Sequence, residues 1–429
     1  MHDENKKIRL AAVLRDIGLV SFGKYGQYAV TVVTVPLIAR VLGAEGLGLL
    51  SIGLSSYFIG SVLVDLGITQ FLSAMMHSEN VDQLRGNYLV IRTCILSTIG
   101  IALFIGLSTH VGPHLQMILL GLFVGGFWSM SEDWVLVGQA RFGSSMAYQG
   151  VGRIAYLLLL VLVLPRHPHA AVALLCMLFS SSLTVGLTWR DSLRTFGRPA
   201  RPRNVLTTVR LGVSVLISRL LEVSYGQGST TVYSSVLDAA SLGLFSAGDR
   251  LVRAIQSLID PIGFALLPRI ARLDGDRRFW NRAIRALLAC VCTASVISLA
   301  VWVAAPTLIG LIYGPGFAGA TPLIRIEAFI LPATAFTSFV TTAILPARKD
   351  AVGVLIGSVI GTSVAVAWLY VAVRTHSVWA LVWGTLNCEV VMALYYVVRM
   401  WRLQMLDQIA VPNKTARQAM VAVRGEAAP

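Results

Sequence analysis

The sequence predicts an all-α integral membrane protein with twelve transmembrane helices, arranged as two six-helix lobes related by a pseudo-two-fold axis. Composition, long apolar runs and an internal repeat predict this fold class. The chain has 429 residues, of which 56% are hydrophobic and 13% charged, and its mean hydropathy is +0.73. A soluble domain carries roughly twice that share of charged residues. The protein is therefore predicted to lie within a membrane.

Twelve apolar runs are long enough to cross roughly 30 Å of hydrocarbon as helices. In chain order they begin near Ile17, Leu47, Tyr88, Leu115, Met146, Ala170, Arg210, Ser241, Ile284, Thr321, Ala351 and Val378. Each half of the chain holds six of these runs. An even number of crossings puts both termini on the same side of the membrane.

Lysine and arginine are distributed unevenly between the two sides of this topology. With the N-terminus inside, the inner segments hold 25 of the 35 basic residues and the outer loops hold 3. Because cytoplasmic segments carry such an excess, we expect both termini in the cytoplasm. The same excess explains the net charge of +14, since the basic loops 190–210 and 269–285 face anionic membrane lipid. Nucleic acid is therefore not expected as a partner.

The domain organisation follows from these runs. Residues 1–16 form a cytoplasmic N-terminus, residues 17–189 the first lobe and residues 210–400 the second lobe. The connection 190–209 is rich in Pro, Gly and Arg, which end helices and favour water. Residues 401–429 form a polar cytoplasmic tail.

An internal repeat relates the two halves. The stretch LGLLSIG at Leu47–Gly53 recurs as LGLFSAG at Leu242–Gly248, an offset of 195 residues, and the same offset relates Asp65 to Asp260. Seven of the 19 positions compared are identical. Internal repeats of this kind are typical of transporters whose substrate site lies between two lobes. Chance similarity between helices rich in Leu, Gly and Ser is the alternative.

Fifteen charged residues fall within the predicted helices. The cations are Lys24, Arg92, Arg153, Arg219, Arg250, Arg253 and Arg325, and the carboxylates are Asp65, Glu132, Asp133, Glu222, Asp249, Asp260, Glu327 and Glu389. Each would cost roughly 3 kcal/mol near the bilayer centre if it faced lipid unpaired. They must therefore face one another or water. Buried salt bridges that only fix helix packing are one alternative, and a water-filled cavity is the other.

Polar residues form seams along three of the predicted helices. Asp249, Arg253, Gln256 and Asp260 lie at i, i+4, i+7 and i+11, which is one face of the eighth helix. Similar seams on the first and seventh helices favour a cavity between the halves. The cavity and ion-coupling candidates are Asp249, Glu222, Asp65, Asp260, Gln27 and Gln256.

The cations point to an anionic substrate. Ammonium and guanidinium groups at membrane depth replace the hydration that a phosphate group loses when it leaves the headgroup layer. Lys24 and Arg219 are related by the repeat, so they can hold one diphosphate from both lobes. The substrate-binding candidates are Lys24, Arg219, Arg253, Arg250, Arg92 and Arg153.

A coupling mechanism is suggested by Asp249 and Arg253, one helical turn apart. We expect them to pair in the empty, inward-open state, and we expect a bound diphosphate to compete for Arg253. The freed Asp249 carboxylate would then take up a proton, which links substrate binding to a proton gradient.

Motifs for cofactors and catalysis are missing from the sequence. It has no G-x-x-x-x-G-K-[ST] phosphate loop, no H-E-x-x-H and no paired C-x-x-C pattern. The outer loops are also too short to house a catalytic domain. We therefore expect no cofactor, no metal site and no enzymatic activity.

Three stretches resemble Wzx-type polysaccharide exporters, the lipid-linked oligosaccharide flippases of the multidrug/oligosaccharidyl-lipid/polysaccharide superfamily. They are VPLIARVLGAEGLGLLSIGLSSYFIGSVLVDLGI at Val35–Ile68, LGLFSAGDRLVRAIQSLIDPIGFALLPRIARL at Leu242–Leu273 and LIYGPGFAGATPLIRIEAF at Leu311–Phe329. The resemblance implies a MATE-like fold with two lobes that rock between inward-open and outward-open states. It also implies an undecaprenyl-diphosphate-linked oligosaccharide substrate in the bacterial inner membrane. A polymerase and a chain-length regulator are the partners that it suggests.

Two other functions remain open at this point. A multidrug/cation antiporter of the same superfamily should have an acidic, apolar pocket, whereas Lys24, Arg219 and Arg253 are cationic. A membrane polymerase or glycosyltransferase would need a large external loop carrying catalytic residues.

Overall fold

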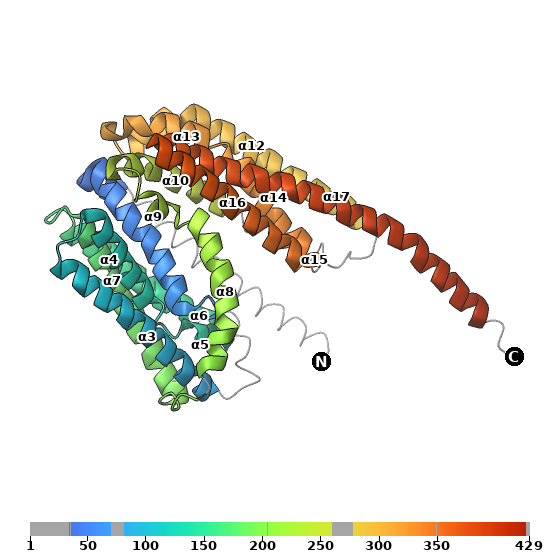
Figure 1. Ribbon diagram of the computed structural model, residues 1–429, viewed down its shortest axis with the longest axis horizontal. Helices are drawn as coiled ribbons and strands as arrows, with labels where there is room; N and C mark the ends of the chain where they lie inside the picture. Colours follow the sequence, from blue (N-terminus) through green and yellow to red (C-terminus); the bar gives the residue numbers. More distant parts are fainter. Residues whose placement is uncertain are drawn as a thin grey trace. The chain divides into compact units, whose positions relative to one another are not determined.

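A computed structural model describes most of the chain. The described residues are 34, 36–69, 81–139, 141–203, 205–259, 278–348 and 350–425. Every regular element in these ranges is a helix (Figure 1). Nine described helices are long and apolar enough to cross a membrane: Pro36–Asp65, Val81–Ser108, Pro113–Gly138, Phe142–Val163, Ala170–Phe196, Phe279–Ile312, Ile330–Ala347, Val352–Thr375 and Val378–Asp407. An all-helical integral membrane protein is therefore confirmed.

The helices belong to two compact units. The first comprises residues 1–247, 308–320 and 376–378, and the second comprises residues 248–307, 321–375 and 379–429. Their limits fall inside three long helices, so those helices contribute to both units.

The elements that lie wholly in the first unit follow the predicted order. After the helix Pro36–Asp65 come α3 (Val81–Ser108), α4 (Pro113–Trp128), α5 (Asp133–Gly138), α6 (Phe142–Val163), α7 (Ala170–Phe196), α8 (Val205–Tyr225), α9 (Ser229–Tyr233) and the 3-10 helix η1 (Pro315–Ala320). Gly43 has a φ of +67°, a left-handed conformation within the helix Pro36–Asp65. It lies where the sequence predicts the loop between the first two crossings, so the structure has helix in place of that loop.

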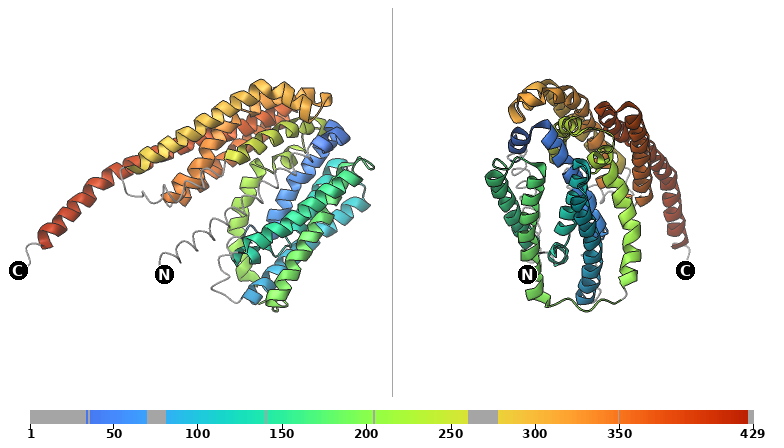
Figure 2. Two further views of the ribbon diagram at one scale, coloured as in Figure 1. Left: turned by 180° about the vertical axis from the view of Figure 1, so that it is seen from behind. Right: turned by 60° about the vertical axis from the view of Figure 1, so that its left-hand side comes forward.

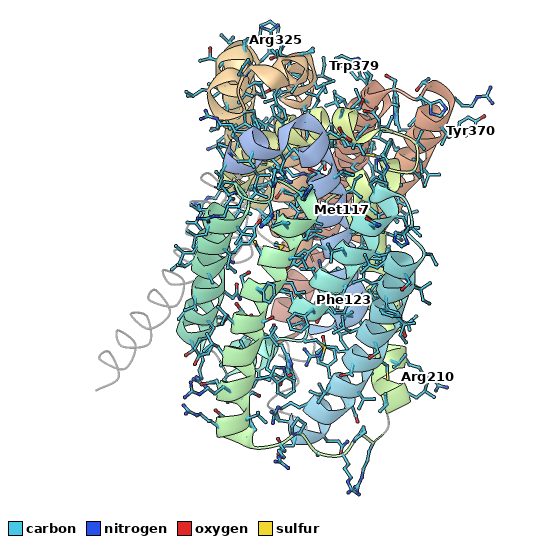
Figure 3. The ribbon with its side chains drawn as sticks, turned by 90° about the vertical axis from the view of Figure 1, so that its left-hand side faces the viewer. Met117, Phe123, Arg210, Arg325, Tyr370 and Trp379 are labelled. Atoms are coloured by element: carbon cyan, nitrogen blue, oxygen red, sulfur yellow. The ribbon has the colours of Figure 1, made fainter. Side chains whose placement is uncertain are left out.

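The core of the first unit is a helix bundle. Helix α6 packs along α7, α3 packs along α4, and α4 packs against α7 (Figure 2). Met117 of α4 and Arg210 of α8 lie toward opposite ends of this unit, with Phe123 between them (Figure 3). Helices α4 and α8 therefore begin toward opposite ends of the unit, and which end faces the cytoplasm stays a prediction.

The second unit contains the remaining helices. They are α13 (Thr321–Glu327), α14 (Ile330–Phe339), the π-helix η2 (Val340–Ile344), α15 (Leu345–Ala347) and α16 (Ala351–Thr375). Helices α10 (Ala239–Ile259), α12 (Arg278–Ile312) and α17 (Val378–Gly425) contribute to both units.

The predicted crossing that begins near Thr321 is not one continuous helix. It is divided into α13, α14, η2 and α15, with a break after Glu327. Pro332 explains the break, because a proline ring clashes with the carbonyl group four residues earlier, here that of Ala328. The Ala328 carbonyl oxygen instead accepts a hydrogen bond from the Ser298 hydroxyl at 2.6 Å.

Two further predicted crossings correspond to α8 and α10, which have 21 residues each. Each carries three charged residues, and neither is among the nine described helices that are long and apolar enough to cross a membrane. The run that begins near Ile17 lies outside the described residues. The other eleven predicted runs each contain helix in the described part of the chain.

Candidate functional site: a repeat-related helix contact, a polar cavity and a buried charge cluster

The helix Pro36–Asp65 and α10 meet through residues that the repeat relates. Gly48 and Gly243 are 195 positions apart, and so are Ser51 and Ser246. The Ser51 hydroxyl donates a hydrogen bond to the Ser246 hydroxyl at 2.5 Å, and both side chains are buried.

The two glycines bring the helix backbones into direct contact. A Cβ atom on Gly48 would lie 1.6 Å from the carbonyl oxygen of Ala239, and one on Gly243 would lie 1.9 Å from that of Ala44. Ala44 and Ala239 are themselves 195 positions apart, so each contact recurs with its partners exchanged. A local two-fold axis between related helices produces such reciprocal contacts. At this contact between the two helices, the packing therefore has the two-fold symmetry that the repeat implies.

Arg92 lies inside the bundle of the first unit. Its Nη2 atom donates to Glu132 Oε1 at 2.6 Å, and its Nη1 atom donates to the carbonyl oxygens of Ser129 and Ser131 at 2.7 and 2.9 Å. Arg85 Nε lies 3.3 Å from the other carboxylate oxygen, Glu132 Oε2. These three charged side chains are fully buried.

The network extends to Asp65, at the end of its helix. Asp65 accepts hydrogen bonds from the hydroxyl groups of Tyr88 and Thr69. The Arg92 guanidinium lies over the Tyr88 ring, 4.1 Å from its centroid. Arg92 and Asp65 thus have partners that fix α3 against its neighbours, which matches the helix-packing alternative for these two residues. Neither is carried into the substrate site proposed below.

A cavity of about 400 Å³ lies between the helix Pro36–Asp65, α4, α6 and α7. Its walls combine aromatic rings, among them Tyr57 and Trp128, with hydroxyl groups such as that of Ser181. The cation among the lining residues is the predicted Arg153, whose Nη2 donates to Gln149 Oε1 at 3.2 Å. Volume and lining are those of a small-ligand site with a few orienting polar groups.

Asp249 and Arg253 of α10 form the predicted pair. Arg253 Nε lies 2.8 and 2.7 Å from the two oxygens of Asp249. Their side chains are 37% and 22% exposed for Arg253 and Asp249, whereas Arg92 and Glu132 are fully buried. The structure contains this pair, and part of the Arg253 side-chain surface is exposed.

Two further carboxyl groups complete this charge cluster in the second unit. Glu327 and Glu389 both interact electrostatically with Arg253. Glu389 Oε2 accepts a hydrogen bond from the Thr337 hydroxyl at 2.8 Å. The cluster therefore contains three carboxyl groups and one guanidinium group.

For three other predicted site residues, only the extent of burial is described. Arg219 of α8 and Arg250 and Gln256 of α10 have half-buried side chains. Lys24, Gln27 and Asp260, and the side chain of Glu222, lie outside the described residues.

Glu327 and Glu389 are among the charged residues of the predicted helices but not among the predicted site candidates, and Arg85 is in neither set. Arg85 falls in a segment predicted to be cytoplasmic, so nothing in the pattern marked it as buried. Glu327 and Glu389 lie on helices without a polar seam. The proline five residues after Glu327 is the one local signal, because it predicts a helix break beside a charged group.

Comparison with known proteins gives the family. Residues 13–274 match the family described as Polysaccharide biosynthesis protein. The chain is 22% identical over 343 residues to the "Succinoglycan biosynthesis transport protein ExoT" of Rhizobium meliloti (strain 1021), covering 75% of this chain and 66% of that protein. It is 20% identical over 386 residues to the "Putative O-antigen transporter" of Shigella dysenteriae, covering 86% of this chain and 95% of that protein.

Solved structures with similar folds cover nearly the whole chain. "Lipid II flippase MurJ, inward closed conformation" has a TM-score of 0.70 at 10% identity, covering 95% of this chain and 93% of that one. An inward-facing multidrug resistance MATE family transporter of the MOP superfamily has a TM-score of 0.63 at 14% identity, covering 87% and 95%. The predicted MATE-like fold is in agreement with both. The chain therefore belongs to the polysaccharide biosynthesis protein family, and its resemblance to the Wzx-type exporters is confirmed.

Proposed function

We propose that this protein is a flippase that moves undecaprenyl-diphosphate-linked oligosaccharide repeat units from the cytoplasmic to the periplasmic leaflet of a bacterial inner membrane. Two lobes, residues 17–189 and 210–400, flank the path, and both termini are cytoplasmic. The transported oligosaccharide is a repeat unit of O-antigen, capsule or a related glycan. A polymerase and a chain-length regulator are the proposed partners that extend the glycan after transport.

The observation that carries this proposal is the accessible Asp249–Arg253 pair in a helix at membrane depth. The Arg253 guanidinium hydrogen-bonds to a carboxylate one turn away on its own helix and interacts electrostatically with Glu327 and Glu389. The Asp249 partner can be exchanged for a ligand without breaking a hydrogen bond between helices. A diphosphate offers two charged oxygens to the planar guanidinium and so competes well for it. A multidrug/cation antiporter would instead need a pocket that attracts cations.

The cavity around Arg153 supports the same assignment. Arg153 lies near the middle of α6. In the proposed topology the cavity extends from there toward the cytoplasmic side, because Ser61 and Trp128 line it near the inner ends of their helices. Aromatic rings stack on the apolar faces of sugar rings, while hydroxyl and amide groups bond to sugar hydroxyls. We therefore assign to this cavity the sugar nearest the diphosphate.

The reciprocal helix contact supports alternating access. In the proposed topology, Gly48 and Gly243 lie near the periplasmic ends of their helices. Their backbone contact closes that end, and the Ser51–Ser246 hydrogen bond lies one turn deeper. Separation of these helices would open the path to the periplasm.

Binding of undecaprenyl diphosphate to purified protein tests the substrate class. We expect Arg253→Ala to weaken binding at least tenfold, because a charge-assisted pair with the diphosphate is lost. We expect Arg374→Ala, at an exposed position near the end of α16, to leave binding unchanged. Equal loss of binding in both variants, or loss of binding in neither, would reject the site.

The Asp249→Asn variant should keep substrate binding, but its transport rate should no longer respond to a pH difference.

A further inference from the structure

Glu327 is a buried carboxyl group beside a break in the helical backbone. Its residue surface is 1% exposed. Helix α13 ends at Glu327 and α14 begins at Ile330, because Pro332 prevents a continuous helix. In the proposed topology α13 starts at the periplasmic side, which puts Glu327 about 10 Å along the crossing.

The surroundings of Glu327 offer no hydrogen bond to its carboxyl group. Neither Oε1 nor Oε2 has a hydrogen-bond partner among the described residues. The backbone of Gly248 on α10 packs directly on it, since a Cβ atom there would lie 2.4 Å from Oε2. The charged groups that act on it are Asp249 and Arg253 of α10. Glu389 of α17 acts on Arg253 in turn.

Ionised Glu327 would be strongly disfavoured in this arrangement. A buried carboxylate without hydrogen bonds costs several kcal/mol, and such a group is neutralised instead. Asp249 adds repulsion and already holds the Nε–H of Arg253 with both its oxygens. The carbonyl groups at the end of α13 also carry partial negative charge. A neutral, protonated Glu327 avoids all three costs.

A metal ion is a poorer occupant than a proton. No group of three or more His, Cys, Asp or Glu side chains within the described ranges is placed to hold a metal. The direct contact with Gly248 also leaves little space at Oε2 for an ion and its further ligands.

We propose that Glu327 is the proton-binding site that couples transport to a proton gradient, a role that rests on the proposed flippase function. In the state described here a proton from the periplasm is bonded to one carboxylate oxygen of Glu327, and Arg253 pairs with Asp249. When Arg253 turns from Asp249 to Glu327, the Glu327 O–H bond breaks and the proton bonds to a carboxylate oxygen of the freed Asp249, from which it leaves toward the cytoplasm. The partner of Arg253 thus decides which carboxyl group is ionised.

Infrared spectroscopy of the purified full-length protein tests the site without any transported lipid. We expect wild-type protein near neutral pH to show a protonated carboxyl absorption that shifts in D₂O. Glu327→Gln should lose this absorption, while the control Glu45→Gln, at an exposed position outside the charge cluster, should keep it. An unchanged absorption in Glu327→Gln, or its loss in Glu45→Gln alone, would overturn the assignment.

Transport in proteoliposomes separates this inference from the proposed function. The probe is a fluorescent polyprenyl-diphosphate-linked sugar, and a pH difference or a sodium difference is imposed. We expect the pH difference alone to accelerate wild-type transport, and Glu327→Gln to transport at a rate that no longer responds to it. Retained pH response in Glu327→Gln overturns the inference, whereas absence of any wild-type transport overturns the flippase assignment while the infrared result still decides the proton site.

Discussion

Gly48 has no room for a side chain where the two repeat-related helices touch. Gly48→Ala would place a Cβ atom 1.6 Å from the Ala239 carbonyl oxygen, and a backbone atom cannot move aside as a side chain can. We expect a loss of about 1–3 kcal/mol in unfolding free energy, as for overpacked cores. Unfolding midpoints in detergent measure it. Gly186→Ala is the control, because a Cβ atom there meets nothing within 4 Å, and equal midpoints for the two variants would contradict the contact.

Asp350, just before the crossing formed by α16, predicts a pH dependence. Hydrogen bonds from Arg399, at 2.7 and 2.8 Å, hold the pKa of the Asp350 carboxyl below its usual value. A lowered pKa in the folded protein adds stability at pH values above the unfolded pKa of about 4, and this stability is lost as pH falls through the folded pKa. Asp350→Asn should therefore lower stability at neutral pH and flatten its decline between about pH 5 and 2. Thermal unfolding across that range checks it, and a parallel decline in both proteins would argue against the pair.

The sequence predicts single-residue features well where both partners lie on one helix. Asp249 and Arg253 are four residues apart, so helical geometry alone brings them together. Glu327 is different, because the groups around it come from α10 and the break in its own crossing. Spacing along the chain carries no information about such contacts, which is why this residue emerged only from the packing.

At the scale of helices, local chemistry explains the difference between prediction and structure. The tenth apolar run has the length and hydropathy of one crossing, so periodicity predicts one helix. Pro332 and Pro346 each remove a backbone donor within it, and the run divides into α13, α14, η2 and α15. Proline positions predict that a break occurs, but not that the Ser298 hydroxyl of α12 donates a hydrogen bond to the freed Ala328 carbonyl oxygen.

The buried charge network of the first unit determines how α3 sits against its neighbours. Glu132 pairs with Arg85 and Arg92, so Glu132→Gln would leave the buried Arg92 guanidinium without its counter-charge, whereas Arg85 keeps Asp82 at 3.2 Å. We expect a loss of about 3–5 kcal/mol, as for other broken buried pairs. Chemical unfolding in detergent measures it.

Asp191→Asn is the matched control for this network. Its partner Arg141 is 37% exposed, so the Arg141–Asp191 pair is partly solvated. We expect a loss of at most about 1 kcal/mol there. If both variants lose the same stability, the network does not hold α3 in place.

At the scale of the whole molecule, composition and topology predict the fold class better than they predict the functional site. Apolar runs and the distribution of Lys and Arg predicted a helical membrane protein, and the family match and similar folds agree. The 195-residue offset relates Gly48 to Gly243, whose reciprocal contact became visible only in the structure. The substrate site is harder to predict from sequence, because arginine serves packing, as at Arg92, and the exchangeable pairing that we propose for Arg253. Only burial and partners distinguish those two roles.

The central claim is that a polyprenyl-diphosphate-linked sugar crosses the membrane when the Ser51–Ser246 contact opens. A Ser51→Cys/Ser246→Cys variant, in a background with the five native cysteines replaced, allows that contact to be closed by oxidation and reopened by reduction. The measurement is translocation of the fluorescent lipid-linked sugar in proteoliposomes. We predict transport in the reduced variant, its loss after oxidation, and recovery when the cross-link is reduced. Equal transport in the oxidised and reduced protein, with the cross-link verified, would contradict the account.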